Sequence, residues 1–281
     1  MIVKALNKEI IRPKKHSIVY DLFYNDATQK APLIIFCHGY KGFKDWGAWN
    51  LMAESFASSG VAFLKFNFSH NGGTVDQPID FPDLDAFAEN NYSKELDDLE
   101  SVIDWVYNAY KNHTSLDIDS IVLMGHSRGG GIVTIKAAED NRVQKLITLA
   151  GVSDFKSRFP KGDALKSWQK EGVYFVENGR TKQKMPHNYQ FYLDFIANEN
   201  RLSIEKAATN ISIPHLIIHG DADAAVPFSE AKQLYRWSQA SIIHKITEGN
   251  HVFGAKHPWE TPEMPPDMVH IFSKILEFIN N

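Results

Sequence analysis

The chain of 281 residues has only one cysteine, Cys37, which excludes an internal disulfide bond. Such scarcity is typical of proteins in a reducing compartment. Residues 1–15 are mixed and charged, and they lack the apolar stretch of a secretory signal peptide. The longest apolar runs, such as 33–37 and 121–124, are far shorter than the roughly 20 residues that span a bilayer. We therefore expect a cytoplasmic protein with no membrane partner.

Basic runs, metal-binding patterns and nucleotide-binding motifs are also missing. The 30 Lys and Arg and 34 Asp and Glu residues give a net charge of −4, and no basic run marks a nucleic-acid surface. The 12 histidines form no H-E-x-x-H pattern or Cys/His cluster that would predict zinc. Neither a Walker-type loop nor a strand-linked G-x-G-x-x-G indicates nucleotide use. We expect no cofactor, no metal and no nucleic-acid partner, while a homodimer is left open.

Short β-rich runs alternate with amphipathic helical stretches along most of the chain. The expected strands are 17–24, 33–37, 61–66, 120–124, 145–149, 214–218 and 242–247, and the main helices are 47–59, 92–112, 129–139, 229–239 and 267–280. Continuous apolar strands that alternate with helices predict an α/β fold, with a mostly parallel central sheet covered by helices on both faces. Large α/β folds reach this length as one unit, so we expect a single domain, 1–281.

Residues 152–212 interrupt this alternation, because they contain no buried-strand run. An Asn-Gly turn at 178–179, between the β-prone flanks 173–176 and 181–184, predicts a hairpin, and a helix follows near 188–200. We interpret 152–212 as a small inserted cap at the sheet edge where ligands bind in open α/β folds. The alternative is a decorative excursion or an oligomer contact. Six aromatic residues could form either a substrate wall or the cap's own core: Tyr174, Phe175, Tyr189, Phe191, Tyr192 and Phe195.

The stretch 125–129, Gly-His-Ser-Arg-Gly, matches G-x-S-x-G and lies between an expected strand and an expected helix. That is the setting of a nucleophile elbow, in which a strained turn exposes the serine. Side chains at Gly125 or Gly129 would clash with such a turn. Ser127 would then lie at a helix N-terminus, where the backbone dipole favours developing negative charge. The alternative is a Gly-Ser loop without chemistry.

A serine nucleophile needs a base, and the base needs an orienting acid. Asp223 lies in the loop after strand 214–218, and His251 lies in the glycine-flanked loop after strand 242–247. Both loops are expected at the same sheet edge as Ser127, in the chain order Ser, Asp, His. Asp221 is a rival acid, although an aspartate in a tight turn usually satisfies local N–H groups. His257 is a rival base, but it precedes a proline and lies farther from the strand end.

Four features together resemble the α/β-hydrolase superfamily: His38-Gly39, the elbow at Ser127, the H-G-x-x-D-x-x-V-P stretch of residues 219–227, and His251. The resemblance covers nearly the whole chain, with 152–212 the least similar part. Within the superfamily the chain is similar to dienelactone-hydrolase-like and cinnamoyl (feruloyl) esterase enzymes. It departs from dienelactone hydrolases in having serine rather than cysteine at the elbow, which favours simple esters as substrates.

The resemblance implies a role for each residue of the motif. Ser127 would be the nucleophile, His251 the general base and then acid, and Asp223 the group that holds the imidazole tautomer. The family spacing from His219-Gly220 also favours Asp223 over Asp221. The backbone N–H groups of Tyr40 and Arg128 would form the oxyanion hole, which stabilises the transition state by about 3 kcal/mol per donor in comparable sites.

Several nearby residues have structural interpretations that we prefer to catalytic ones. His38, His126 and His219 are expected to pack loops, and Cys37 ends a buried strand as a small apolar residue. The Arg128 guanidinium could bind an acidic substrate group, but a structural ion pair with a nearby Asp or Glu is favoured.

The sequence therefore predicts a serine esterase for small to medium, including aromatic, acyl groups. A serine peptidase or a thioesterase on the same triad is an alternative, and so is a hydrolase-fold protein that binds a ligand without catalysis. The complete set of three residues argues against this last alternative.

Overall fold

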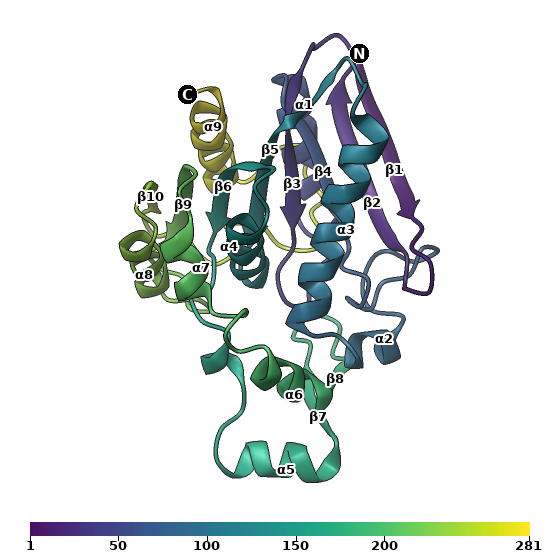
Figure 1. Ribbon diagram of the computed structural model, residues 1–281, viewed down its shortest axis with the longest axis vertical. Helices are drawn as coiled ribbons and strands as arrows, with labels where there is room; N and C mark the ends of the chain where they lie inside the picture. Colours follow the sequence, from purple (N-terminus) through teal and green to yellow (C-terminus); the bar gives the residue numbers. More distant parts are fainter.

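The computed structural model describes residues 1–281 and contains an eight-stranded sheet with helices on both faces (Figure 1). The strands are β1 (Ile2–Ile10), β2 (Ile18–Asn25), β3 (Ala31–Cys37), β4 (Ala62–Phe66), β5 (Leu116–His126), β6 (Val143–Leu149), β9 (His215–Gly220) and β10 (Ser241–Ile246). Their spatial order is β1-β2-β4-β3-β5-β6-β9-β10. Only β1 with β2 and β2 with β4 pair antiparallel, so the predicted α/β architecture with a mostly parallel sheet is confirmed.

Two layers of helices bury the two faces of the sheet. One apolar core contains residues of α1 (Trp49–Ser58) and α9 (Pro266–Asn280), and the other contains residues of α3 (Tyr92–Tyr110), α4 (Arg128–Glu139) and α8 (Phe228–Trp237). Each of these helices lies where an amphipathic stretch predicts it, because the apolar stripe of each has a sheet face to cover. None of the helices is both long enough and apolar enough to cross a bilayer.

Residues 152–212 contribute α5 (Asp163–Glu171), β7 (Val173–Glu177), β8 (Lys184–Asn188), α6 (Gln190–Ala197) and α7 (Ile204–Asn210). The β7–β8 hairpin is present as expected, but its second strand begins at residue 184 rather than 181. The elements from α5 to α6 extend beyond the carboxyl edge of the sheet, at the end of the molecule opposite both termini (Figure 1). By contrast, α7 packs against α4 within the helical layer. The part that covers the sheet edge is therefore shorter than 152–212.

A buried ionic cluster fixes the loop that follows β3. The Lys44 ammonium, on this loop, donates hydrogen bonds to Asp21 at 2.8 Å, to Asp45 at 2.6 Å and to Asn7 at 2.6 Å. The Lys65 ammonium on β4 donates to the same two aspartates. Both lysines are almost completely buried. Although burial opposes ionisation, the ammonium groups of Lys65 and Lys44 lower the pKa of Asp45 to about 2.

Replacing one carboxylate of this cluster should destabilise the fold. We expect Asp21→Asn to lower the free energy of unfolding by about 3–5 kcal/mol, because two buried ammonium groups would then share one carboxylate. Urea titration at neutral pH measures the loss. The matched control is Asp97→Asn, since Asp97 is half exposed and 3.8 Å from Lys15, and it should cost less than about 1 kcal/mol. Equal stability of the Asp21→Asn variant and the parent protein would contradict the prediction.

Candidate active site

Ser127 occupies a strained turn between β5 and α4. Its backbone has a φ of 56°, a left-handed value that is unfavourable for a residue with a side chain. Two glycines make the turn possible. A Cβ atom on Gly125 would lie 2.3 Å from the Gly129 carbonyl oxygen, and one on Gly129 would lie 2.3 Å from the Cys37 carbonyl oxygen. The G-x-S-x-G pattern therefore forms the strand–turn–helix geometry that the sequence predicts.

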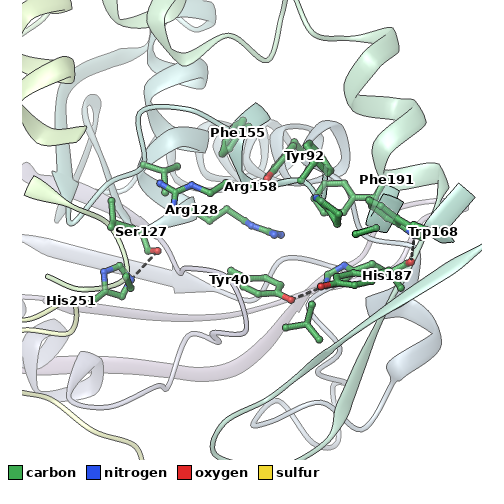
Figure 2. A pocket seen from close by; sticks show the side chains of 18 residues that line it. Tyr40, Tyr92, Ser127, Arg128, Phe155, Arg158, Trp168, His187, Phe191 and His251 are labelled. Carbon is green, nitrogen blue, oxygen red and sulfur yellow. Dashed lines mark hydrogen bonds between the residues drawn. The ribbon is translucent and has the colours of Figure 1, made fainter. Parts of the chain in front are cut away.

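The structure brings Ser127, His251 and Asp223 into one hydrogen-bonded line. The Ser127 Oγ and His251 Nε2 atoms are 3.0 Å apart (Figure 2), and His251 Nδ1 is 2.7 Å from Asp223 Oδ2. Because an ionised carboxylate can only accept, Nδ1 carries the proton and Nε2 is free to accept one from the serine hydroxyl. The three residues come from loops after β5, β9 and β10, as the sequence pattern indicates.

The Asp223 carboxylate is completely buried and held at both oxygens. Its Oδ1 accepts hydrogen bonds from the backbone N–H groups of Ala225 and Val226, each at 2.8 Å. The Nε2 atom of His219 lies 3.4 Å from Oδ2 and donates to the Val226 carbonyl at 2.8 Å. Although burial opposes ionisation, the polar contacts of Asp223 with His219, His251 and the Val226 N–H hold the pKa of its carboxyl well below the usual value. The carboxylate therefore stays ionised beside His251.

The two rival residues make other contacts. Asp221 accepts from the Glu248 N–H and pairs with Lys245 at 2.9 Å, at the protein surface. His257 accepts from the Gly47 N–H at 3.0 Å. Neither rival hydrogen-bonds to Ser127 or His251.

Two further histidines fix the loops around this line through backbone contacts. His126 donates from Nε2 to the His251 carbonyl oxygen at 2.8 Å, and His38 donates from Nδ1 to the Gly39 carbonyl oxygen at 2.9 Å. Burial is the main reason why the pKa of His126 falls to about 3 and that of His38 to about 4. Both rings are therefore neutral at physiological pH, which agrees with their expected role in loop packing.

The loop after β3 passes directly over Ser127. A Cβ atom on Gly39 would lie 2.9 Å from the Ser127 Cβ, so only glycine permits this approach. The backbone N–H of the next residue, Tyr40, has no hydrogen-bond acceptor in the protein. Arg128 is the first residue of α4, where N–H groups lack an intrahelical partner. The two N–H groups predicted for an oxyanion hole are thus both adjacent to the Ser127 turn and available as donors.

Ser127 and His251 lie at one end of a cavity of about 680 Å³ (Figure 2). Its volume suits a ligand of drug-like size, and most of its lining is apolar or aromatic. Residues of the 152–212 segment form much of the wall: Val152, Phe155, Arg158, Phe159, Pro160, Ala164, Trp168, Tyr174, Val176, His187 and Phe191.

Arg128 extends from the elbow along the wall of this cavity (Figure 2). The guanidinium pairs with buried Glu95 at 3.2 Å, which confirms the structural ion pair that the sequence analysis favours. Its central carbon also lies 4.4 Å from the ring centre of Tyr40, 5.1 Å from that of Tyr92 and 5.4 Å from that of Phe191. These cation–π contacts hold the side chain in place as part of the cavity wall.

A hydrogen bond across the cavity joins the loop after β3 to the β7–β8 hairpin. The Tyr40 hydroxyl lies 2.7 Å from His187 Nε2, and the Trp168 indole donates to the His187 carbonyl oxygen at 2.8 Å (Figure 2). Burial, followed by the positive charges of Arg128 and Lys41, lowers the pKa of His187 to about 3. The ring is therefore neutral, and its hydrogen bond with the Tyr40 hydroxyl lets the hairpin brace the loop that carries the Tyr40 N–H.

The six aromatic residues of the 152–212 segment divide between the two roles considered for them. Tyr174 and Phe191 line the cavity, while Tyr189, Tyr192 and Phe195 pack into the adjoining core. Phe175 does neither, since it is 52% exposed. Sequence reasoning missed His187, Trp168 and Tyr92 as cavity residues, because no local pattern shows which way such side chains point.

Comparison with known proteins places this geometry in a family. Residues 32–182 match the family model described as the alpha/beta hydrolase fold. The chain belongs to that family. Its α/β-hydrolase fold is also seen in the structure of Est1E from Butyrivibrio proteoclasticus bound to ferulic acid, with a TM-score of 0.69 and 19% sequence identity over 97% of this chain and 98% of the other.

Two curated relatives are similar in sequence to parts of this member of the alpha/beta hydrolase family. The quorum-quenching protein AidA of Acinetobacter baumannii is 29% identical over 47% of this chain and 39% of its own length. The bifunctional esterase/perhydrolase DCH of Acinetobacter calcoaceticus is 24% identical over 74% of this chain and 80% of its own. The chain thus spans less than half of the first relative.

Proposed function

We propose that the protein is a serine esterase that hydrolyses carboxylic esters through an acyl-enzyme on Ser127. The observation that carries the proposal is the line from Ser127 Oγ through His251 to Asp223, at 3.0 and 2.7 Å, beside a cavity that holds a ligand. This is the arrangement of nucleophile, base and orienting acid that acyl transfer requires.

The reaction proceeds in two proton-balanced steps. The Ser127 oxygen attacks the ester carbonyl carbon while His251 Nε2 takes the hydroxyl proton. The tetrahedral intermediate collapses when the imidazolium returns that proton to the departing alkoxide, which leaves as the alcohol. Water then attacks the acyl-serine with His251 again as base, and the products are the carboxylic acid and free Ser127.

The backbone N–H groups of Tyr40 and Arg128 would stabilise the oxyanion of each tetrahedral intermediate. Each fixed donor of this kind lowers the barrier by about 3 kcal/mol in comparable sites. The loop after β3, which carries the Tyr40 N–H, is held by the ionic cluster at Lys44 and by the hydrogen bond between Tyr40 and His187. This donor therefore needs little rearrangement before reaction.

The large cavity favours an acyl group of small to medium size, including an aromatic one. Its aromatic walls, formed by residues such as Phe155, Trp168 and Phe191, would stack on an aryl ring. The ferulic acid bound to the structurally similar Est1E is an aromatic acid of this size.

A fluorophosphonate probe tests the proposal directly, since it reacts only with an activated serine. We expect stoichiometric labelling of the folded protein, with the adduct mapped by mass spectrometry to the peptide that contains Ser127. Heat-denatured protein and the Ser127→Ala variant are the controls, and neither should be labelled. A folded protein that stays unlabelled, while a known serine esterase reacts in parallel, would favour a ligand-binding role without catalysis.

A further inference from the structure

Ser127 lies between two cavities of different character. A second cavity of about 260 Å³ shares only Tyr40, Ser127 and His251 with the large one. Its other walls come from the segment between β3 and the start of α1, from the end of β5, from the loop of the hairpin and from the residue after His251, and they include Lys41, Asn178 and Arg180. An ester has two halves on either side of the attacked carbonyl, so each half can enter one cavity.

The large, mostly apolar cavity suits the acyl half, which leaves the smaller one for the alcohol half. The smaller cavity has Lys41 and Arg180 in its wall and no aspartate or glutamate. The Arg180 guanidinium is already paired with Asp80. Lys41, in contrast, has only one hydrogen bond, from its ammonium to the Glu177 carbonyl oxygen at 3.1 Å, and pairs with no carboxylate. A net positive charge therefore remains in the wall of the cavity that Ser127 also lines.

Three more observations point to a ligand for this charge. Burial lowers the pKa of Lys41, and no neighbouring carboxylate offsets that effect. The residue also has a φ of 54°, and such strained backbone tends to occur at ligand-binding positions. Nearby, the buried Asn178 uses its side-chain oxygen to accept from the Arg180 N–H, and its amide NH₂ has no partner in the protein. That NH₂ group is a second free donor in the cavity wall.

We propose that this smaller cavity is a leaving-group subsite for an anionic alcohol, one that carries a carboxylate or a comparable anion, with Lys41 as the main recognition residue. The inference rests on the proposed esterase function and adds the class of alcohol to it. The Lys41 ammonium would donate to the anion, and the Asn178 amide would donate a second hydrogen bond. Since Lys41 follows Tyr40, an alcohol held there lies beside the predicted oxyanion donor.

The test compares 4-acetoxybenzoate, whose leaving group is an anion, with the neutral isostere 4-acetoxybenzamide. The readout is the ratio of their kcat/KM values in each variant, so that intrinsic reactivity cancels between variants. We expect Lys41→Met to lower this ratio about tenfold or more, and Lys41→Arg to keep most of it, because a charge-assisted hydrogen bond is lost only in the first. The matched control is Lys182→Met, which removes the same charge from an exposed lysine of the hairpin loop and should leave the ratio unchanged.

Two outcomes would overturn the assignment. Equal loss on both substrates would show that Lys41 acts through the loop and not on substrate charge. In a second matched pair, phenyl hydrogen adipate carries a negative charge on its acyl half, and phenyl hexanoate is its neutral counterpart. If Lys41→Met changed the ratio for this pair instead, the two cavities would have the opposite roles.

A binding measurement separates this inference from the proposed catalysis. In the Ser127→Ala background, which needs no turnover, 4-hydroxybenzoate is titrated by calorimetry against the variant with and without Lys41→Met. We expect binding that weakens about tenfold or more when Lys41 is replaced. Absent binding, or unchanged binding in the double variant, would refute the subsite even if the ester reaction were established. Binding without any esterase activity would refute the proposed function alone.

Discussion

Ser127→Ala should reduce the turnover of p-nitrophenyl acetate by a factor of about 10⁴ or more, to near the background rate. The reason is that the substitution removes the only atom that forms the covalent acyl bond, while it leaves the oxyanion donors and the cavity intact. The melting temperature should stay nearly unchanged, because alanine has the same Cβ and must adopt the same left-handed backbone at this position. Steady-state kinetics and thermal unfolding on the same preparation measure both quantities.

The control for this prediction is Ser273→Ala, which removes a hydroxyl from the exposed face of α9, far from the cavity. Its activity should match that of the parent protein. Turnover that survived Ser127→Ala would require another nucleophile. Cys37 is a poor replacement, since it is completely buried and burial raises the pKa of its thiol. Retained activity would therefore contradict the proposed chemistry itself, and not only the identity of one residue.

The parts of the site that sequence reasoning located are those fixed by short-range constraints. The two glycines of the elbow lie within one five-residue pattern. Asp223 and His251 each follow an apolar strand, and the sequence itself shows where that strand ends. Parallel strands then bring their carboxyl ends to one edge without any further information. This is why three residues separated by up to 124 positions could be predicted to converge.

Features that depend on long-range packing could not be read in the same way. β1 escaped prediction because it is an edge strand, paired only with β2 and largely exposed, so that it lacks an apolar pattern. Lysine is usually a surface residue, and only the fold shows that Lys44 and Lys65 are buried together. The position of His187 opposite Tyr40 likewise depends on where the hairpin folds back, which no spacing encodes.

Asp223→Asn should lower kcat/KM for an ester by a factor of about 10⁴, and Asp221→Asn by less than about tenfold. In the first variant, the side-chain oxygen would keep the two backbone hydrogen bonds from Ala225 and Val226, since only an oxygen can accept them. The NH₂ group would then face His251 Nδ1, which must give up its proton to accept.

The imidazole would consequently carry its proton on Nε2, where it faces the Ser127 hydroxyl and can no longer take a proton from it. Asp221, in contrast, is an exposed partner of Lys245 and has no contact with the ring, so the same change there leaves the tautomer intact. Kinetics of the two variants against the parent protein provide the comparison. If Asp221→Asn proved the more damaging, the orienting acid would have to be reassigned, and the hydrogen bonds at Asp223 would then serve only to shape the turn after β9.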